Sequence, residues 1–209
     1  MTPFIAPDIR TPEGLRRLPV RFGVIEDVGD LRSWRIGRGH PFATAARDSI
    51  EYAKLASKRW RYYARRGEIA KSLSDLKCRA SRGCEDEVGF LIVAESRWEH
   101  TPPTLAIAWC RRTWSHHLVL DFLASHPFTF DPRSGFAGVG SAMLIALGLI
   151  TAELDIPLIW GEATAVSAGF YSKRVLSGQP VKDHFFIRDE HLAALQQDGI
   201  RFAVDSPRP

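Results

Sequence analysis

One stretch near the middle of the chain restricts the fold more than any other. An apolar segment of strand length, 117–124, precedes a turn with three glycines, and an apolar run of helical length, 140–154, follows it. The glycines of the turn are Gly135, Gly138 and Gly140. A buried strand that leads through a turn into an apolar helix predicts a crossover connection, in which a helix covers one face of a sheet.

The glycine turn also indicates a phosphate site. Glycine allows positive φ and close approach of a ligand to the backbone, and a helix N-terminus offers unpaired N–H groups at the positive end of its dipole. The alternative is an ordinary strand-to-helix turn. Two known phosphate motifs do not match, because the P-loop requires a lysine directly after Gly140 and the dinucleotide fingerprint requires a glycine where Met143 stands.

Four segments of this region resemble, in order, parts of the GNAT superfamily of N-acetyltransferases. Segment 120–127 is similar to the fourth strand, and segment 138–140, Gly-Val-Gly, resembles the core of the Arg/Gln-x-x-Gly-x-Gly/Ala signature. Segment 157–164 resembles the fifth strand, and 167–173 resembles the helix that places a tyrosine near the sulfur of coenzyme A. The resemblance implies an α+β fold, a mixed sheet of six to seven strands flanked by helices.

The resemblance also implies an acyl-CoA cofactor, acetyl-CoA or another short acyl thioester. In this family the fourth and fifth strands part from each other and the thioester lies between them. Backbone groups of the fourth strand hold the pantetheine arm, and amides of the glycine loop hold the pyrophosphate. The implied cofactor-binding positions are Leu123, Ser125, Phe136, Ala137, Gly138, Val139, Gly140, Ser141 and Thr164.

Acyl transfer to an amine requires loss of a proton from the amine, donors for the oxyanion and protonation of the leaving thiolate. By resemblance, Tyr171 is the general acid toward the sulfur. Asp121 and Glu162 lie on the two strands beside the thioester, and a buried carboxylate there has the raised pKa that suits a base. For each of these residues a structural role is the alternative. His126 at the strand exit is a weaker candidate, and a base supplied by water is also open.

Other catalytic chemistries find little support. Segment 165–169 lacks the first glycine of a nucleophile elbow. His116 and His117 are adjacent, so on a strand they point to opposite faces and do not share a metal ion. We therefore expect direct attack by the amine, with no acyl-enzyme and no metal.

The sequence departs from the family pattern near the cofactor and acceptor sites. Gly135 occupies the Arg/Gln position of the signature, with Arg133 nearby, and the connection 127–138 is unusually long. Thr164 stands where the family often carries asparagine. The acceptor, a small-molecule or macromolecular amine, is therefore not specified, and a non-catalytic CoA-binding module is an alternative.

Composition sets the wider limits. A chain of 209 residues with 45% apolar and 25% charged residues is typical of one globular domain, expected over 20–209, after an extended N-terminal arm, 1–19. No apolar run approaches the ~18 residues of a membrane span, and the N-terminus lacks a secretory apolar segment. The three cysteines, Cys78, Cys84 and Cys110, form no disulfide framework. These features favour a cytoplasmic protein without a membrane partner; a homodimer is left open.

Positive charge is concentrated in 47–82, which holds eleven Lys/Arg against four Asp/Glu, a local excess of +7 in a chain of net charge +4. The apolar period of 45–65 predicts a helix with one core-facing stripe, N-capped by Thr44. A second, basic stripe with interleaved tyrosines is typical either of a solvated helix face or of a nucleic-acid contact. A GNAT enzyme that modifies tRNA or DNA bases is thus a second alternative.

The remaining elements follow from apolar runs and from turn residues. Strands are expected at 20–27, 88–95, 104–110, 183–187 and 200–204, and helices at 68–80 and 190–197.

Overall fold

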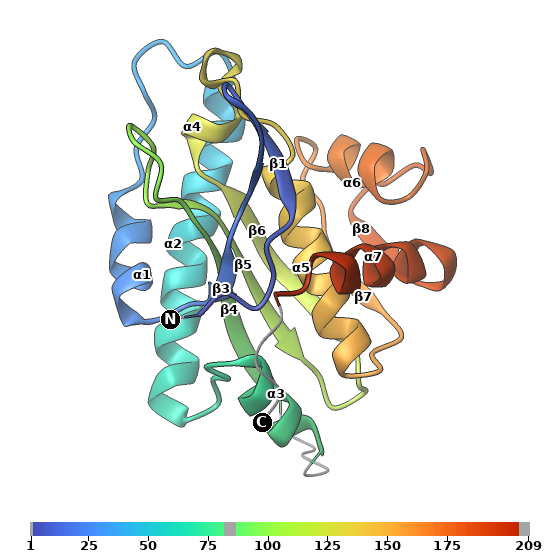
Figure 1. The fold of residues 1–209 in the computed structure, drawn as a ribbon. Helices are drawn as coiled ribbons and strands as arrows, with labels where there is room; N and C mark the ends of the chain where they lie inside the picture. The colour runs from blue at the N-terminus through green and yellow to red at the C-terminus, as the bar shows by residue number, and fades with distance from the viewer. Residues whose placement is uncertain (1, 82–86, 205–209) are drawn as a thin grey trace.

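The computed structural model describes residues 2–81 and 87–204 (Figure 1). These residues form a six-stranded mixed sheet of order β3-β4-β5-β6-β7-β8, with helices on both faces and a separate two-stranded hairpin. The expected α+β class is confirmed, with the sheet at the smaller of the two expected sizes.

The sheet combines an antiparallel meander with one parallel pair, β6 and β7. Its strands are β3 (Val20–Phe22), β4 (Val88–Glu95), β5 (Thr104–Arg112), β6 (Leu118–Ser125), β7 (Ile159–Glu162) and β8 (His184–Ile187). The central strands are buried on both faces, which is why they read in the sequence as continuous apolar runs rather than alternating ones.

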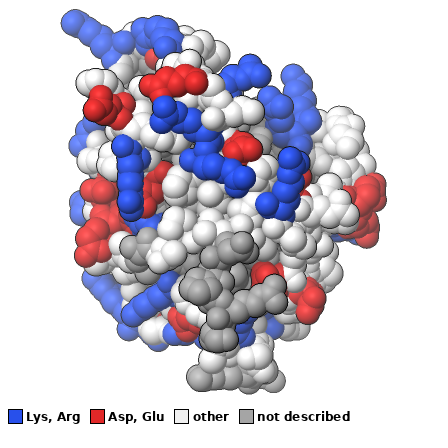
Figure 2. All heavy atoms as spheres, viewed as in Figure 1, with Lys and Arg blue, Asp and Glu red and all other residues white. Residues whose placement is uncertain are grey.

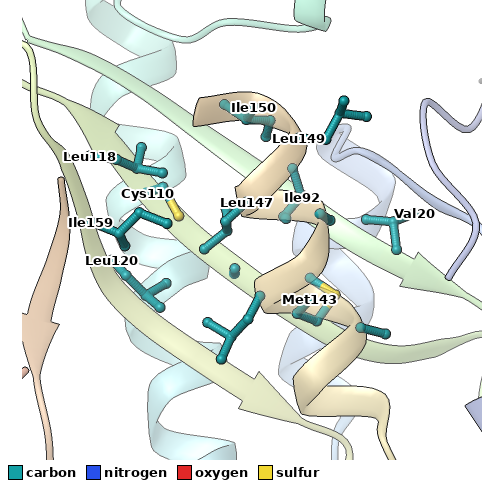
Figure 3. Packing of buried hydrophobic residues seen from close by; sticks show 14 of the residues in the cluster. Val20, Ile92, Cys110, Leu118, Leu120, Met143, Leu147, Leu149, Ile150 and Ile159 are labelled. Carbon is teal, nitrogen blue, oxygen red and sulfur yellow. The ribbon is translucent and has the colours of Figure 1, made fainter. Parts of the chain in front are cut away.

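Helices cover both faces of the sheet. They are α1 (Ile25–Asp30), α2 (Ala43–Arg66), α3 (Leu73–Ser81), α4 (Pro127–Phe130), α5 (Val139–Glu153), α6 (Ala168–Arg174) and α7 (Asp189–Phe202), with the 3₁₀ turns η1 (Leu31–Ser33) and η2 (Pro132–Ser134). On one face, α2 packs over a core cluster that includes Trp109. On the other, α5 supplies Met143 and Leu147 to the main core cluster, and Leu147 points toward the sheet side chains around Cys110 and Leu120 (Figure 3).

Helix α5 is apolar on nearly every side because α7 covers the surface that faces away from the sheet. The two helices approach at glycines. A Cβ on Gly148 would lie 2.2 Å from the Leu195 carbonyl oxygen, and one on Gly199 would lie 2.5 Å from the Leu149 nitrogen. The crossover helix expected from the sequence is thus held between the sheet and α7.

The N-terminal segment differs from the extended arm that we expected. It forms the hairpin of β1 (Asp8–Thr11) and β2 (Gly14–Arg17). Ile5, Ile9 and Leu18 are at most 1% exposed and belong to the main core cluster. Burial of these isolated aliphatic residues anchors the segment to the core, whereas its prolines had indicated an extended arm.

One predicted strand is too long, and another is wrong. The first ends at Phe22 rather than at residue 27, because Asp27 caps α1 by accepting from the Val24 amide (2.7 Å) and pairs with Arg21 (2.7 Å). The last, 200–204, is mostly the end of α7, and only Ala203 makes an isolated bridge, to Ile5.

Helix boundaries also required correction. The N-cap of α2 is Phe42, so Thr44 lies inside the first turn. Helix α3 begins at Leu73 rather than at residue 68, because the Ser72 hydroxyl accepts from the Asp75 amide (3.0 Å). Residues 82–83, just after the expected end of this helix, lie outside the described residues. Cys84 also lies outside them.

Candidate functional site

Strands β6 and β7 pair only at their beginnings. The parallel ladder runs from Leu118 and Ile159 to Leu120 and Gly161. Strand β6 then continues for five residues, to Ser125, and among the described residues no strand lies on that side of it. The backbone edge of β6 past Leu120 therefore has no partner strand, and at its end the Ser125 carbonyl accepts from the Ser49 hydroxyl of α2.

A β-bulge begins where the ladder ends. Trp109 on β5 pairs with Phe122, and Cys110 pairs with Leu120, so Asp121 has no partner on β5. Bulges bend a strand and often occur beside active sites. As a result Phe122 packs with the α2 cluster, while Leu123 packs with the α5 cluster and pairs with Ala108.

The first turn of α5 lies beside the end of β6. Gly138 is the N-cap with φ +93°, and the first helical bond runs from the Ala142 amide to the Gly138 carbonyl (2.8 Å). A Cβ on Gly140 would lie 3.2 Å from the Phe170 ring and 3.9 Å from the Ser125 hydroxyl. Three segments that the sequence predicted to share a site, β6, α5 and α6, therefore meet at Gly140.

The N-terminal hairpin is hydrogen-bonded to part of the glycine loop. The Ala137 amide donates to the Arg10 carbonyl (3.0 Å), the Arg10 amide donates back (3.0 Å), and the Phe136 amide donates to the Ser134 hydroxyl (3.2 Å). We expected the amides of residues 136 and 137 to contact phosphate, but in the structure both already donate hydrogen bonds within the protein. The N–H groups that lack an intrahelical acceptor are those of Gly138, Val139, Gly140 and Ser141.

Tyr171 on α6 is buried, with 4% of its surface exposed. Its ring stacks on Phe185 with centroids 3.8 Å apart and an angle of 15° between the planes. Burial, with smaller contributions from Tyr52 and Cys110, raises the pKa of Tyr171 well above its ordinary value. The hydroxyl therefore keeps its proton at neutral pH.

The two carboxylates that the sequence proposed as bases have different surroundings. Asp121 accepts two bonds from Arg111, at 2.6 and 2.8 Å, and Arg111 also pairs with Glu87 at 2.5 Å. Glu162 was expected to be buried and is not: its side chain is 82% exposed, with His184 4.0 Å away. Asp121 is thus held in an ion pair, whereas Glu162 is open to solvent.

His126 and Thr164 serve local structure. His126 Nδ1 caps α4 by accepting from the Phe128 amide (3.1 Å), and its ring packs edge-on against Trp34 (5.0 Å). Burial lowers the pKa of His126 to about 4, so the ring is neutral at physiological pH. The Thr164 amide donates to the Ser167 hydroxyl (2.9 Å) in the turn that precedes α6.

Sequence reasoning missed one residue at this site, Tyr52. It reaches from α2 to Phe122, with ring centroids 5.5 Å apart. Burial raises the pKa of Tyr52, and the charges of Asp48 and Glu162 add to the effect. In the sequence, Tyr52 stood out only as one of the tyrosines interleaved with the basic stripe of 45–65, and nothing there linked it to the strand at 118–125.

Within residues 2–81 and 87–204, no three His, Cys, Asp or Glu side chains converge as metal ligands. In the same residues no helix has both the length and the apolar character needed to cross a membrane.

Comparison with known proteins finds similarity among solved structures. The chain is similar to a GNAT-family acetyltransferase from Staphylococcus aureus Mu50, with 11% identity and a TM-score of 0.43 over 81% of this chain and 97% of that one. No protein-family model matches the sequence. No curated protein matches it either.

Proposed function

We propose that the chain is an acyl-CoA-dependent N-acyltransferase that transfers an acetyl or other short acyl group to an amine. The observation that carries this proposal is the meeting of β6, α5 and α6 at Gly140, where β6 has lost its partner strand. An open strand edge that leads to a helix N-terminus suits a long cofactor with an amide-rich arm and a pyrophosphate. The edge supplies backbone groups for the arm, and the helix supplies N–H groups for the charge.

In this proposal the pyrophosphate accepts from the amides of residues 138–141. The pantetheine arm runs along β6, against backbone groups of Leu123 and the amide of Ser125, because the Ser125 carbonyl already accepts from Ser49. Thr164 lies on the other side of the arm. Engaging Phe136 or Ala137 as well would require bonds to Ser134 or Arg10 to break, so we assign these two a shaping role.

Transfer proceeds by direct attack of the amine on the thioester carbonyl. A C–N bond forms, the C–S bond breaks, and the amine loses a proton. Tyr171 donates its proton to the departing sulfur and recovers one from solvent; the hydroxyl is protonated at neutral pH and can therefore donate. Of the two candidate bases, Glu162 has the more accessible oxygens. We assign Asp121, which is paired with Arg111, to stabilising the bulge.

Native mass spectrometry of the purified protein titrated with acetyl-CoA tests the proposal. We expect an adduct of one acetyl-CoA per chain, lost in Gly140→Glu because the added carboxylate repels the pyrophosphate at the helix N-terminus. Gly37→Glu is the matched control, since a side chain there meets no atom within 4 Å. No adduct with folded wild-type protein, or equal loss in both variants, would overturn the proposal.

A further inference from the structure

An open hollow of about 520 Å³ lies between the η1 segment and the first half of α2. The cations that line it are Arg32, Arg35, Arg47 and Lys54, and the single carboxylate among its lining residues is Glu51. Trp34 and Ile50, both buried, form its apolar part. None of these residues belongs to the site proposed above for the acyl-CoA.

Charge in the hollow is unbalanced. Lys54 pairs with Glu51 at 2.7 Å. Among the described residues, Arg32, Arg35 and Arg47 have no carboxylate within salt-bridge distance, and Arg35 and Arg47 donate only to backbone carbonyls. Three guanidinium groups around one hollow repel one another, and a bound anion removes that repulsion. The forked donors of arginine suit phosphate in particular.

The positive charge continues along α2. Lys58, Arg61 and Arg65 follow Arg47 and Lys54 on one side of the helix, and in the part of the chain that the structure describes none of the three has a salt bridge. From Arg47 to Arg65 the row spans about 27 Å at 1.5 Å per residue. We call these seven cations, from Arg32 to Arg65, the basic flank.

Several cations elsewhere in the basic region 47–82 are paired with carboxylates, among them Arg66 with Glu68 (2.7 Å). Lys77 of α3 pairs with Glu153, and Arg79 pairs with Asp75 at 2.9 Å. On the face that carries α5 and α7, Lys and Arg side chains are interspersed with acidic and uncharged ones (Figure 2). Among the described residues, most cations of the basic region that lack a salt bridge therefore lie on one side of α2, and the segment before this helix adds Arg32 and Arg35.

We propose that the basic flank binds the phosphodiester backbone of a nucleic-acid strand. The arginines of the hollow hold one phosphate, and the row on α2 holds those that follow. A row of ~27 Å exceeds a single nucleotide and matches several phosphates, because a nucleic-acid strand carries one charge per ~3.4 Å in a duplex. Tyr62, 54% exposed near the end of the row, has the Arg66 guanidinium 5.4 Å from its ring centroid, which adds a further cation beside the row. This inference does not depend on acyl transfer.

Fluorescence anisotropy with labelled single-stranded RNA and DNA of about 20 nucleotides tests the proposal. Removal of two phosphate contacts in the double variant Arg47→Gln/Lys58→Gln should lower the slope of log K against log salt by about 1.4 and weaken binding about 25-fold at 0.1 M salt. The matched control is Arg97→Gln/Arg188→Gln, which removes the same charge from side chains 79% and 71% exposed outside the flank.

Either of two results would overturn the inference: no binding by the wild-type protein at low salt, or an equal loss in the flank and control variants. Vesicles with anionic lipid serve as a second probe. Flank-dependent binding to vesicles without binding to either oligonucleotide would assign the surface to a membrane instead and would also refute the proposal. Circular dichroism of each variant confirms that it is folded.

Discussion

The contact between α5 and α7 gives the sharpest stability prediction. In Gly148→Ala, the added methyl group would lie 2.2 Å from the Leu195 carbonyl oxygen and 2.5 Å from the carbonyl carbon. These are backbone atoms inside a helix, so no side-chain rotation relieves the overlap. The helices must move apart, and the apolar contacts of α5 that face α7 loosen with them.

The magnitude follows from two opposing effects. Overpacking of a close contact costs about 1–3 kcal/mol, and the upper end is appropriate where backbone must shift. Alanine is favoured over glycine inside a helix by about 1 kcal/mol, which offsets part of that cost. We therefore expect a net loss of about 2 kcal/mol or more in the free energy of unfolding.

Urea denaturation followed by circular dichroism measures this loss. Gly29→Ala is the control, because Gly29 also lies in a helix and a Cβ there meets nothing within 4 Å. That variant should be as stable as the wild type or slightly more so. If Gly148→Ala is also as stable as the wild type, the close approach of α5 and α7 is not present in solution.

Two further predictions concern Tyr171 and His126. Tyr171→Phe should lower acetyl-CoA turnover with a given amine about 100-fold while leaving acetyl-CoA binding intact, because the ring still stacks on Phe185; unchanged turnover would remove Tyr171 from the chemistry. Between its ordinary pKa of 6.5 and its folded value of about 4, His126 binds more protons in the unfolded chain, so stability falls as the pH falls through that window. His126→Asn, which keeps an acceptor for the Phe128 amide, should flatten this part of the stability profile in thermal unfolding, and parallel wild-type and variant profiles would contradict the assignment.

The central strands and the long helices were predictable from the sequence because burial dictates their composition. Strand β4 has the predicted bounds, since each residue from Val88 to Ala94 faces one core or the other. The apolar stripe of α2 gave its helical period in the same way. In both cases the local pattern and the tertiary environment agree.

The wrong elements are those where tertiary contacts override the local pattern. Residues 200–204 alternate as a strand does, yet Gly199 lets α7 pack on α5 and the helix continues to Phe202. At the candidate site the glycine loop was visible in the sequence. The use of the Ala137 amide by Arg10 was not, because that bond joins residues far apart in the chain.

That bond bears on the order in which the molecule assembles. The hairpin runs up to α4 and the glycine loop (Figure 1), and Gly135, at φ +71°, would have its Cβ only 2.9 Å from Pro12. During synthesis the hairpin emerges before the glycine loop, and more than a hundred residues separate the two. Closing so long a segment carries an entropic penalty and tends to come late. The glycine loop should therefore reach its final geometry among the last events of folding, and a chain that lacks its first dozen residues should lose the shape of the loop.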